Sequence, residues 1–329
     1  MSQPDPRFEV PTVDIGPYLR DPSSDAAADV VEAIRVACTG SGFFQVVNHS
    51  ISRELQDSMQ QAARALFALP LEEKTKLIHP TLTNRGYELI GSQILQADAL
   101  PDLKEGFCIG QHMGFGDARV QEHPHLMGPN MFPASLEEHA FKTPAQQYYT
   151  ELFDMAYRIM EMLAKGLPYG DDIFVPFMSN DPVCILRLLH YPPQTNPDER
   201  QLGAGAHTDF GAITLLWQDS CGGLEVQDGQ TGEWHAVEPN PESLVVNIGD
   251  MLSIWTNTYR STVHRVINPR GKQGRYSMAF FVDGNTDVRL APLDGSVPAT
   301  GKIMTTEEHM EYRIGKTYRR VAAQAKPQP

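Results

Sequence analysis

After about Asp181 the chain becomes a succession of short apolar or alternating segments, separated by glycine, proline, asparagine and aspartate. The segments are VCILRLLHYPP, ITLLWQ, LEVQD, EWHAVEP, SLVVNIGDMLSIWT, STVHRVI and RYSMAFFVDG. Short apolar or alternating runs bounded by turn residues are typical of strands, and many such strands in succession form a sandwich or a barrel. We therefore expect a double-sheet jelly roll in this part of the chain.

The residues before this region are predicted to be mostly helical. Amphipathic helices are expected within residues 23–42, 51–70 and 144–170, because apolar residues recur there at helical spacing. GFFQVVNHS (residues 42–50) is expected to form a short buried strand, and residues 111–142 a long irregular connection. A last helix should follow Thr305, where Thr-Thr-Glu-Glu offers a capping box with Glu308.

Composition and charge indicate a globular protein and argue against nucleic-acid-binding and membrane-spanning classes. Hydrophobic residues make up 41% and charged residues 21% of the 329 positions, which is typical of a globular chain. The net charge of −14 and the lack of a lysine or arginine cluster argue against a nucleic-acid partner. No apolar run reaches membrane-spanning length, and the amino end does not resemble a secretory signal, so we expect a cytoplasmic protein, a monomer by default. The cysteines have no zinc-binding spacing and are expected to be reduced thiols: Cys38, Cys108, Cys184 and Cys221.

The segment HTDFGAITLLWQD (residues 207–219) carries a candidate metal site. On a strand, residues two apart point to the same face, so His207 and Asp209 should project together. His264, in the apolar run STVHRVI, is a third candidate ligand that a returning strand could bring alongside. Two imidazoles and one carboxylate on one face of a metal are typical of non-haem iron(II) oxygenases. Zinc also binds three protein ligands and a water, so the triad leaves the metal open.

A second group of inward-facing polar residues lies in GRYSMAFF. Arg275 and Ser277 should face the interior together with Ala279 and Phe281. A buried guanidinium requires an anion, and a carboxylate can bind it through two hydrogen bonds. Apart from Asp209, no inward acidic residue is evident in these strands, so we expect the anion to be a ligand.

These motifs together resemble the iron(II)/2-oxoglutarate-dependent dioxygenases of the isopenicillin N synthase-like branch. His-Thr-Asp…His followed by Arg-Tyr-Ser carries the resemblance, and VPTVDIGPYL, GFFQVVNHSI, FALPLEEKTKL, GGLEVQD and VVNIGDMLSIWTN extend it over nearly the whole chain. The resemblance implies an α+β fold, with a double-stranded β-helix (jelly-roll) core flanked by N-terminal helices and a C-terminal helix. Residues 1–175 would be the helical region packed on the core, 181–288 the dioxygenase core, and 289–329 a C-terminal extension, together one compact unit.

The resemblance also implies the roles of individual residues. His207, Asp209 and His264 match the family's iron ligands. Arg275 and Ser277 match the pair that binds the distal carboxylate of 2-oxoglutarate, and Tyr191 matches a tyrosine that assists them. The implied reaction uses O2, converts 2-oxoglutarate to succinate and CO2, and couples this to oxidation of a C–H bond: hydroxylation, desaturation, ring closure or ring expansion.

One departure from the family's plant members bears on the substrate. Where many of them read Asn-Tyr-Tyr-Pro, this chain reads Leu189-His190-Tyr191-Pro192. The chain is therefore more similar to microbial members, and we expect a small secondary metabolite as substrate. Because the Arg-x-Ser pair also occurs in relatives that use no 2-oxoglutarate, an oxidase of the same fold without that cosubstrate is the nearest alternative.

Candidate substrate-binding residues follow from alternation and from the resemblance. Counting back by twos from Tyr191 places Arg187 on the inward face, either as a substrate anchor or as the partner of an acidic residue from the helical half. Phe210 and Leu224 could be apolar walls beside the triad or ordinary core residues. Segments that border the substrate mouth in the family contain four further candidates: Asn84, Arg85, Tyr87 and Phe107.

Two other functions would use the same residues. A zinc hydrolase needs a general base beside the metal, and no inward glutamate near His207 is suggested. A non-catalytic jelly-roll protein could bind 2-oxoglutarate or another acid, but it would not need an open metal site.

Overall fold

The computed structural model describes residues 8–195, 198–271, 273–298 and 301–324. Within them, eight strands form a large sheet in the order β1-β2-β10-β7-β12-β5-β4-β3, and four form a smaller sheet in the order β6-β11-β8-β9. The strands of the large sheet are β1 (Thr12–Asp14), β2 (Phe43–Val47), β3 (Gly86–Glu88), β4 (Glu105–Gly110), β5 (Val183–Tyr191), β7 (Ile213–Gln218), β10 (Leu244–Ile248) and β12 (Arg275–Gly284). Those of the smaller sheet are β6 (Ala204–His207), β8 (Leu224–Gln227), β9 (Trp234–Ala236) and β11 (His264–Val266).

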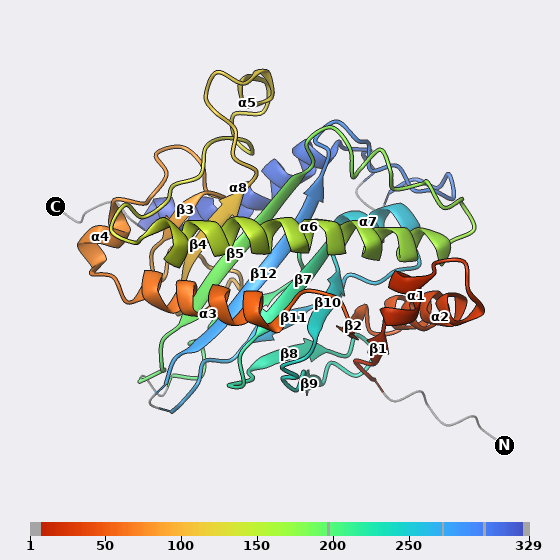
Figure 1. Cartoon of the computed structure of the whole chain (residues 1–329), viewed down its shortest axis with the longest axis horizontal. Coiled ribbons are helices and arrows are strands. Elements are labelled where there is room, and N and C mark those ends of the chain that lie inside the picture. The colour runs from red at the N-terminus through yellow and green to blue at the C-terminus, as the bar shows by residue number, and fades with distance from the viewer. Residues whose placement is uncertain (1–7, 196–197, 272, 299–300, 325–329) are drawn as a thin grey trace.

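Helices α3 and α6 cover one face of the large sheet, and Figure 1 shows them crossing in front of its strands. Their bounds are α1 (Gly16–Arg20), α2 (Asp25–Thr39), α3 (Arg53–Phe67), α4 (Leu71–Thr75), α5 (Ala118–Glu122), α6 (Lys142–Lys165), α7 (Asp250–Thr256) and α8 (Thr306–Gln324), with a 3-10 turn η1 (Glu138–Ala140). The predicted α+β jelly roll with flanking helices is confirmed.

Strand alternation separates two environments in the large sheet. On β12, Met278, Phe280 and Val282 belong to the hydrophobic core that the helices cover. Arg275, Ser277, Ala279 and Phe281, which alternate with them, line a cavity on the opposite face. Because a strand turns successive side chains to opposite faces, one strand supplies both the core and the site.

The predicted helix signals are present in the structure. The Ser24 hydroxyl caps α2 by accepting a hydrogen bond from the Ala27 amide (3.2 Å). At α8, the Thr305 hydroxyl accepts from the Glu308 amide, and the Glu308 carboxylate accepts from the Thr305 amide, which is the predicted capping box. The stripe of α6 predicted to be core is buried: Tyr148, Leu152, Met155, Ile159 and Met162.

Three segments differ from the sequence-based expectation. SLVVNIGDMLSIWT, expected to be a strand, is β10 followed by α7, since Met251, Leu252 and Trp255 recur at helical spacing after Gly249. The first half also contributes β3 and β4 to the large sheet. The connection 111–142 contains α5 and η1, and α5 projects at the top of Figure 1.

All four cysteines are free thiols, as predicted; Cys38, Cys108 and Cys184 are buried and Cys221 is exposed. Among the described residues we find no helix whose length and apolar character would let it cross a membrane.

Packing between α6 and the large sheet should contribute strongly to stability. Phe280 is fully buried, and its ring packs edge-on against Tyr149 of α6 (5.3 Å between centroids). We expect Phe280→Ala to lower the free energy of unfolding by about 3–5 kcal/mol because it leaves a cavity in the core. Urea denaturation monitored by circular dichroism measures the change.

The matched control is Phe115→Ala, whose ring is 67% exposed. It should change the free energy of unfolding by less than about 0.5 kcal/mol. Similar losses in both variants would contradict the assignment of Phe280 to the core.

Candidate active site

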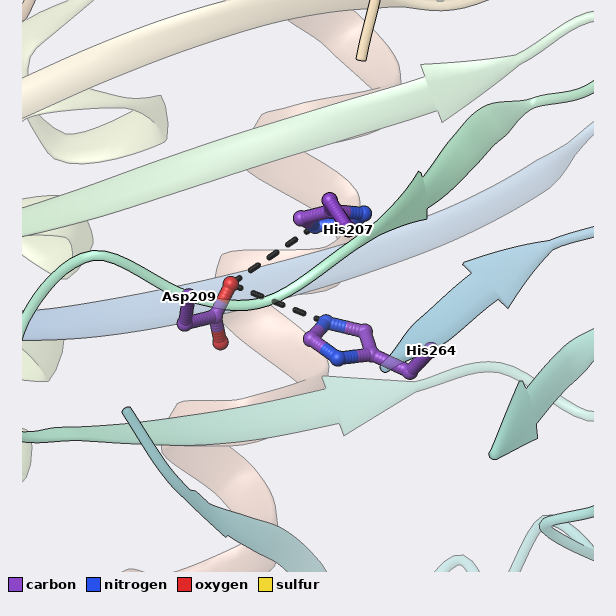
Figure 2. Close-up of side chains that lie close together, drawn as sticks. All are labelled: His207, Asp209 and His264. Atoms are coloured by element: carbon purple, nitrogen blue, oxygen red, sulfur yellow. Dashed lines mark ion pairs between the residues drawn. The ribbon is translucent and has the colours of Figure 1, made fainter. Parts of the chain in front are cut away.

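The three predicted ligand residues converge between the two sheets. His207 is the last residue of β6, His264 is the first of β11, and the two are paired directly across these antiparallel strands. Asp209 follows β6 by two residues, and Oδ1 lies 3.6 Å from Nε2 of both His207 and His264 (Figure 2). The three candidate ligand atoms all lie within 4.8 Å of one another. This donor set could hold one divalent metal ion.

Neighbouring groups hold each of these side chains in place. Nδ1 of His207 lies 2.7 Å from the Gly205 carbonyl oxygen, and Nδ1 of His264 lies 3.1 Å from that of Thr262. A proton on each Nδ1 leaves the facing Nε2 lone pairs available for a metal. The other oxygen of Asp209, Oδ2, accepts hydrogen bonds from the Thr214 hydroxyl (2.6 Å) and the Asn247 amide (2.7 Å).

The three groups are electrostatically coupled. Burial and the nearby His264 lower the pKa of His207 to about 3. Burial lowers the pKa of His264 as well, but the Asp209 carboxylate outweighs this and raises that pKa above its usual value. The pKa of Asp209, which burial raises, is brought below its usual value by the two imidazoles and the Thr214 hydroxyl. Since both imidazoles face the same carboxylate, one shared proton is enough to neutralise it. A metal cation would take the place of that proton.

Arg275 lines a cavity of about 70 Å³ that is also lined by all three residues of the triad. The guanidinium is 1% exposed and donates to the Gly222 carbonyl (2.7 Å), the Ser277 hydroxyl (3.0 Å) and the Gln218 side-chain oxygen (3.0 Å). It also stacks 4.8 Å from the ring centre of Tyr191. Among the described residues, no carboxylate forms an ion pair with it. The predicted cluster of Arg275, Ser277 and Tyr191 is therefore present and carries an uncompensated positive charge.

A second cavity, of about 110 Å³, shares His207 and Asp209 with the first. Helix α8 contributes Met310 and Ile314 to its wall. The cavity has a mixed lining, with polar residues beside apolar ones: Thr83, Asn84, Glu88, Gln93, Leu95, Cys108, Ile185, Arg187, Phe210, Gly211, Phe281 and Asp283. His207 and Asp209 thus lie between a small cavity lined by the cationic Arg275 and a larger cavity that could receive another molecule.

Arg187 lines both cavities, and its charge is compensated. Its guanidinium forms an ion pair with Glu88 of β3 (2.7 Å) and donates to the Gln93 side-chain oxygen (3.1 Å). This is the acidic partner that the sequence left open, although it comes from a strand of the first half and not from a helix.

The apolar candidates divide between the two cavities. Phe210 lines the larger one, where the guanidinium of Arg313 from α8 lies 4.3 Å from its ring centre. Arg313 also donates to the carbonyl and hydroxyl oxygens of Thr208 and pairs with Asp250. Leu224 lines the smaller cavity, near Arg275.

Of the four residues expected near the substrate mouth, the structure places only Asn84 on the wall of the larger cavity. Tyr87 is buried and donates to Glu105 (2.6 Å), and Phe107 packs edge-on against Phe141. Arg85 is buried, with its guanidinium bonded to the backbone carbonyls of residues 84 and 111.

Glu105 of β4 carries a buried carboxylate that pairs with a lysine. Its carboxylate accepts hydrogen bonds from Lys74 (2.7 Å) and Tyr87, and lies 2.8 Å from Nδ1 of His190. This buried network lies outside both cavities, so Glu105 supports the fold.

Sequence reasoning missed several polar residues around the triad. Thr214 and Asn247 stand in apolar strand segments, and a polar residue in such a segment is a signal that could have identified them. Lys104, which is buried, lines the smaller cavity and pairs with Asp102 (2.5 Å). Asp283 lines the larger cavity, so the expectation that Asp209 is the only inward acidic residue of these strands is wrong; the alternation that places Phe281 inward also reaches Asp283.

Two family models match the chain. Residues 10–135 match the N-terminal part described as "non-haem dioxygenase in morphine synthesis", and residues 182–284 match the 2OG-Fe(II) oxygenase superfamily.

Curated relatives match over almost the whole length. The chain is 48% identical to the 2-oxoglutarate-dependent dioxygenase citB of Monascus ruber, over 94% of this chain and 96% of that protein. It is 41% identical to the clavatol oxidase claD of Penicillium crustosum, over 95% of this chain and 98% of that protein.

Solved structures give the same result. A full-length Neurospora crassa protein, solved in complex with alpha-KG and thymine, superposes with a TM-score of 0.80 at 27% identity, covering 97% of this chain and 98% of that one. A 2OG-Fe(II) oxygenase family protein from Caulobacter crescentus has a TM-score of 0.80 at 32% identity, covering 94% and 99%. With two relatives above 40% identity over nearly its full length, and with the triad in place, the chain belongs to the 2-oxoglutarate- and iron(II)-dependent oxygenase family.

Proposed function

We propose that His207, Asp209 and His264 bind the iron(II), that Arg275, Ser277 and Tyr191 bind 2-oxoglutarate, and that the larger cavity holds a small metabolite. One observation carries this proposal: a buried arginine without a carboxylate partner among the described residues lines a cavity whose other residues include the triad. Such a guanidinium is suited to the distal carboxylate of a diacid.

As a 2-oxoglutarate-dependent dioxygenase, the enzyme uses Fe(II), 2-oxoglutarate and O2, and this set supplies oxidative decarboxylation coupled to C–H oxidation. In our proposal the protein's part is to position and to shield. Arg275 and Ser277 orient the cosubstrate, and Tyr191 supports the guanidinium through its ring. Phe281, Phe210, Met310 and Ile314 form the apolar part of the larger cavity's wall, which helps to exclude water from the reacting atoms.

The alternatives from the sequence are less well supported. A zinc hydrolase would need a general base. Glu88 lines the larger cavity and is the candidate glutamate there, but its carboxylate forms an ion pair with Arg187. A silent binding protein would not require two imidazoles and a carboxylate arranged as metal ligands. In an oxidase that uses no 2-oxoglutarate, the substrate itself would have to supply the anion that pairs with Arg275.

We propose a secondary metabolite as the substrate, because the similar fungal proteins are a 2-oxoglutarate-dependent dioxygenase, citB, and a clavatol oxidase, claD. Arg187 is assigned here to shaping the cavity through its ion pair with Glu88. Hydroxylation is the simplest outcome, and desaturation, ring closure or ring expansion would require the substrate radical to be held away from the oxidant.

We also propose that the enzyme acts as a cytoplasmic monomer. Its triad and both cavities are formed by one chain, so a second copy is not needed to complete them. Its free thiols, one of them exposed, suit a reducing compartment.

The first prediction concerns the metal and the cosubstrate together. Anaerobic protein supplied with Fe(II) and 2-oxoglutarate should develop a weak absorption band in the green, due to charge transfer from iron to the chelated cosubstrate. Asp209→Ala should abolish this band and weaken iron binding more than about a hundredfold, since it removes a ligand. Asp228→Ala, at an exposed loop, is the control and should keep the band. A wild-type protein without the band would refute cosubstrate binding at the metal.

The second prediction concerns the cosubstrate end of the smaller cavity. Arg275→Gln removes the charge but retains hydrogen-bonding capacity, so KM for 2-oxoglutarate should rise about 10- to 100-fold, the equivalent of a charge-assisted contact. The assay is succinate formation at varied 2-oxoglutarate. Arg265→Gln is the control, because Arg265 pairs with Glu225 and stacks on Trp234 away from both cavities. An equal rise in KM in the two variants would contradict the assignment of Arg275 to cosubstrate binding.

The third prediction concerns the ion pair in the larger cavity. Glu88 is 9% exposed at its side chain, so Arg187→Met should leave a buried carboxylate unpaired and lower the free energy of unfolding by about 3 kcal/mol. The double variant Arg187→Met/Glu88→Gln should recover more than half of this loss. Urea denaturation of both variants measures it, and no recovery would mean that the two residues do not depend on each other.

A further inference from the structure

Asp283 is the one polar residue of β12 that faces the larger cavity near its carboxyl end, while Arg275 and Ser277 on the same strand face the smaller cavity. The strand is irregular here: Val282 pairs with Cys184 and Gly284 with Val183, so Asp283 is the extra residue of a β-bulge. Bulges redirect a side chain and are common beside active sites.

The bulge depends on Gly284. Its φ of +73° lies in the left-handed region, and a Cβ on this residue would lie 1.9 Å from the ring of Phe177. Gly211 provides further room, since a Cβ there would lie 2.5 Å from Oδ1 of Asp283. Two glycines thus permit a carboxyl group at this point of the cavity wall.

The carboxyl group of Asp283 has no partner in the part of the chain that the structure describes. The residue is 6% exposed, and none of the hydrogen bonds or ion pairs of the described residues involves its side-chain oxygens. Burial and the charge of Asp209 raise its pKa to about 7. A buried carboxyl group without a hydrogen-bond donor destabilises the folded protein, so a ligand is the natural source of the missing donor.

Two other polar side chains of the cavity wall, Asn84 and Arg187, already donate to protein acceptors. The Asn84 amide donates to the Leu126 carbonyl, and its side-chain oxygen is buried without a partner. Arg187 is bound by Glu88 and Gln93. A ligand here meets two unsatisfied acceptors, which favours a molecule that donates hydrogen bonds and disfavours a free carboxylate.

We propose that Asp283 accepts a hydrogen bond from a hydroxyl group of the substrate and so determines which carbon of a hydroxylated, largely apolar molecule faces the metal. This inference rests on the proposed function, because it assumes that the larger cavity is the substrate site. Hydrogen-atom removal from carbon needs no protein base, so the carboxyl group is free to serve binding.

Binding of matched probe molecules tests the proposal. The pair p-cresol and 4-methylanisole differ only by methylation of the hydroxyl group, and each can be titrated anaerobically into the Fe(II) and 2-oxoglutarate complex while the green absorption band is followed. The wild-type enzyme should bind p-cresol at least about tenfold more tightly. Asp283→Leu, of similar size, should reduce this preference below about threefold, whereas Asp287→Leu, at an exposed position on the same segment, should retain it.

Every result of this titration decides the question. A wild-type enzyme that does not distinguish the two probes, or that binds neither, overturns the proposal, and so does an Asp283→Leu variant with an unchanged preference. These failures differ from failure of the proposed function, in which the wild-type enzyme would not develop the band at all.

Thermal stability gives a second test that needs no substrate. If the Asp283 carboxyl group lacks a structural partner, Asp283→Asn should raise the Tm of the iron- and 2-oxoglutarate-loaded enzyme at pH 8 by about 2 °C or more. Asp219→Asn is the matched control, because Asp219 is also buried but accepts hydrogen bonds from the amides of Cys221 and Tyr276, and its Tm should fall. A lowered or unchanged Tm for Asp283→Asn would show a structural role and overturn the proposal.

Discussion

The register of β12 between β5 and β7 is the constraint on which the site depends. Backbone pairing places Ser277 opposite Leu189 and Gln218, and Arg275 opposite Tyr191. This sets the stacking of Tyr191 on the guanidinium and its hydrogen bonds to Ser277 and Gln218. A shift of one residue would turn Arg275 toward the hydrophobic core and Phe280 toward the cavity, so packing against α6 and cosubstrate binding favour the same register.

The two sheets contribute different parts of the site. The smaller sheet places the two imidazoles, and the large sheet supplies Thr214 and Asn247, which bind the carboxylate that completes the triad. The metal position is therefore defined by contact between the sheets. Because the second oxygen of Asp209 is held by two donors, the first is left to face both imidazoles.

Much of this arrangement could be predicted from the sequence. The period-two alternation around Arg275 identified the inward face of β12, and the His-Thr-Asp…His pattern, together with its resemblance to known oxygenases, identified the residues that converge and the family to which the chain belongs. Local signals were also sufficient for the caps of α2 and α8, since the capping residues lie within a few positions of the amides they bind.

Contacts between distant segments were beyond sequence reasoning. Glu88 and Arg187 are brought together only because β3 and β5 both flank β4, a strand that was not predicted. Asp283 continues the alternation of β12 onto the cavity side, but the bulge at this position and the lack of a protein partner for its carboxyl group depend on contacts that the sequence does not show. The sequence of α7 predicts a strand because its apolar residues continue directly from those of β10.

The contacts of Arg313 have a mechanical consequence. This residue of α8 holds Thr208, which lies between His207 and Asp209, while Met310 and Ile314 of the same helix form part of the larger cavity's wall. The same helix therefore contacts both the backbone between the two ligands and the wall of the larger cavity. A bulky substrate that displaces α8 would also move Thr208, which lies between His207 and Asp209. The size of the substrate and the geometry of the metal ligands are therefore coupled.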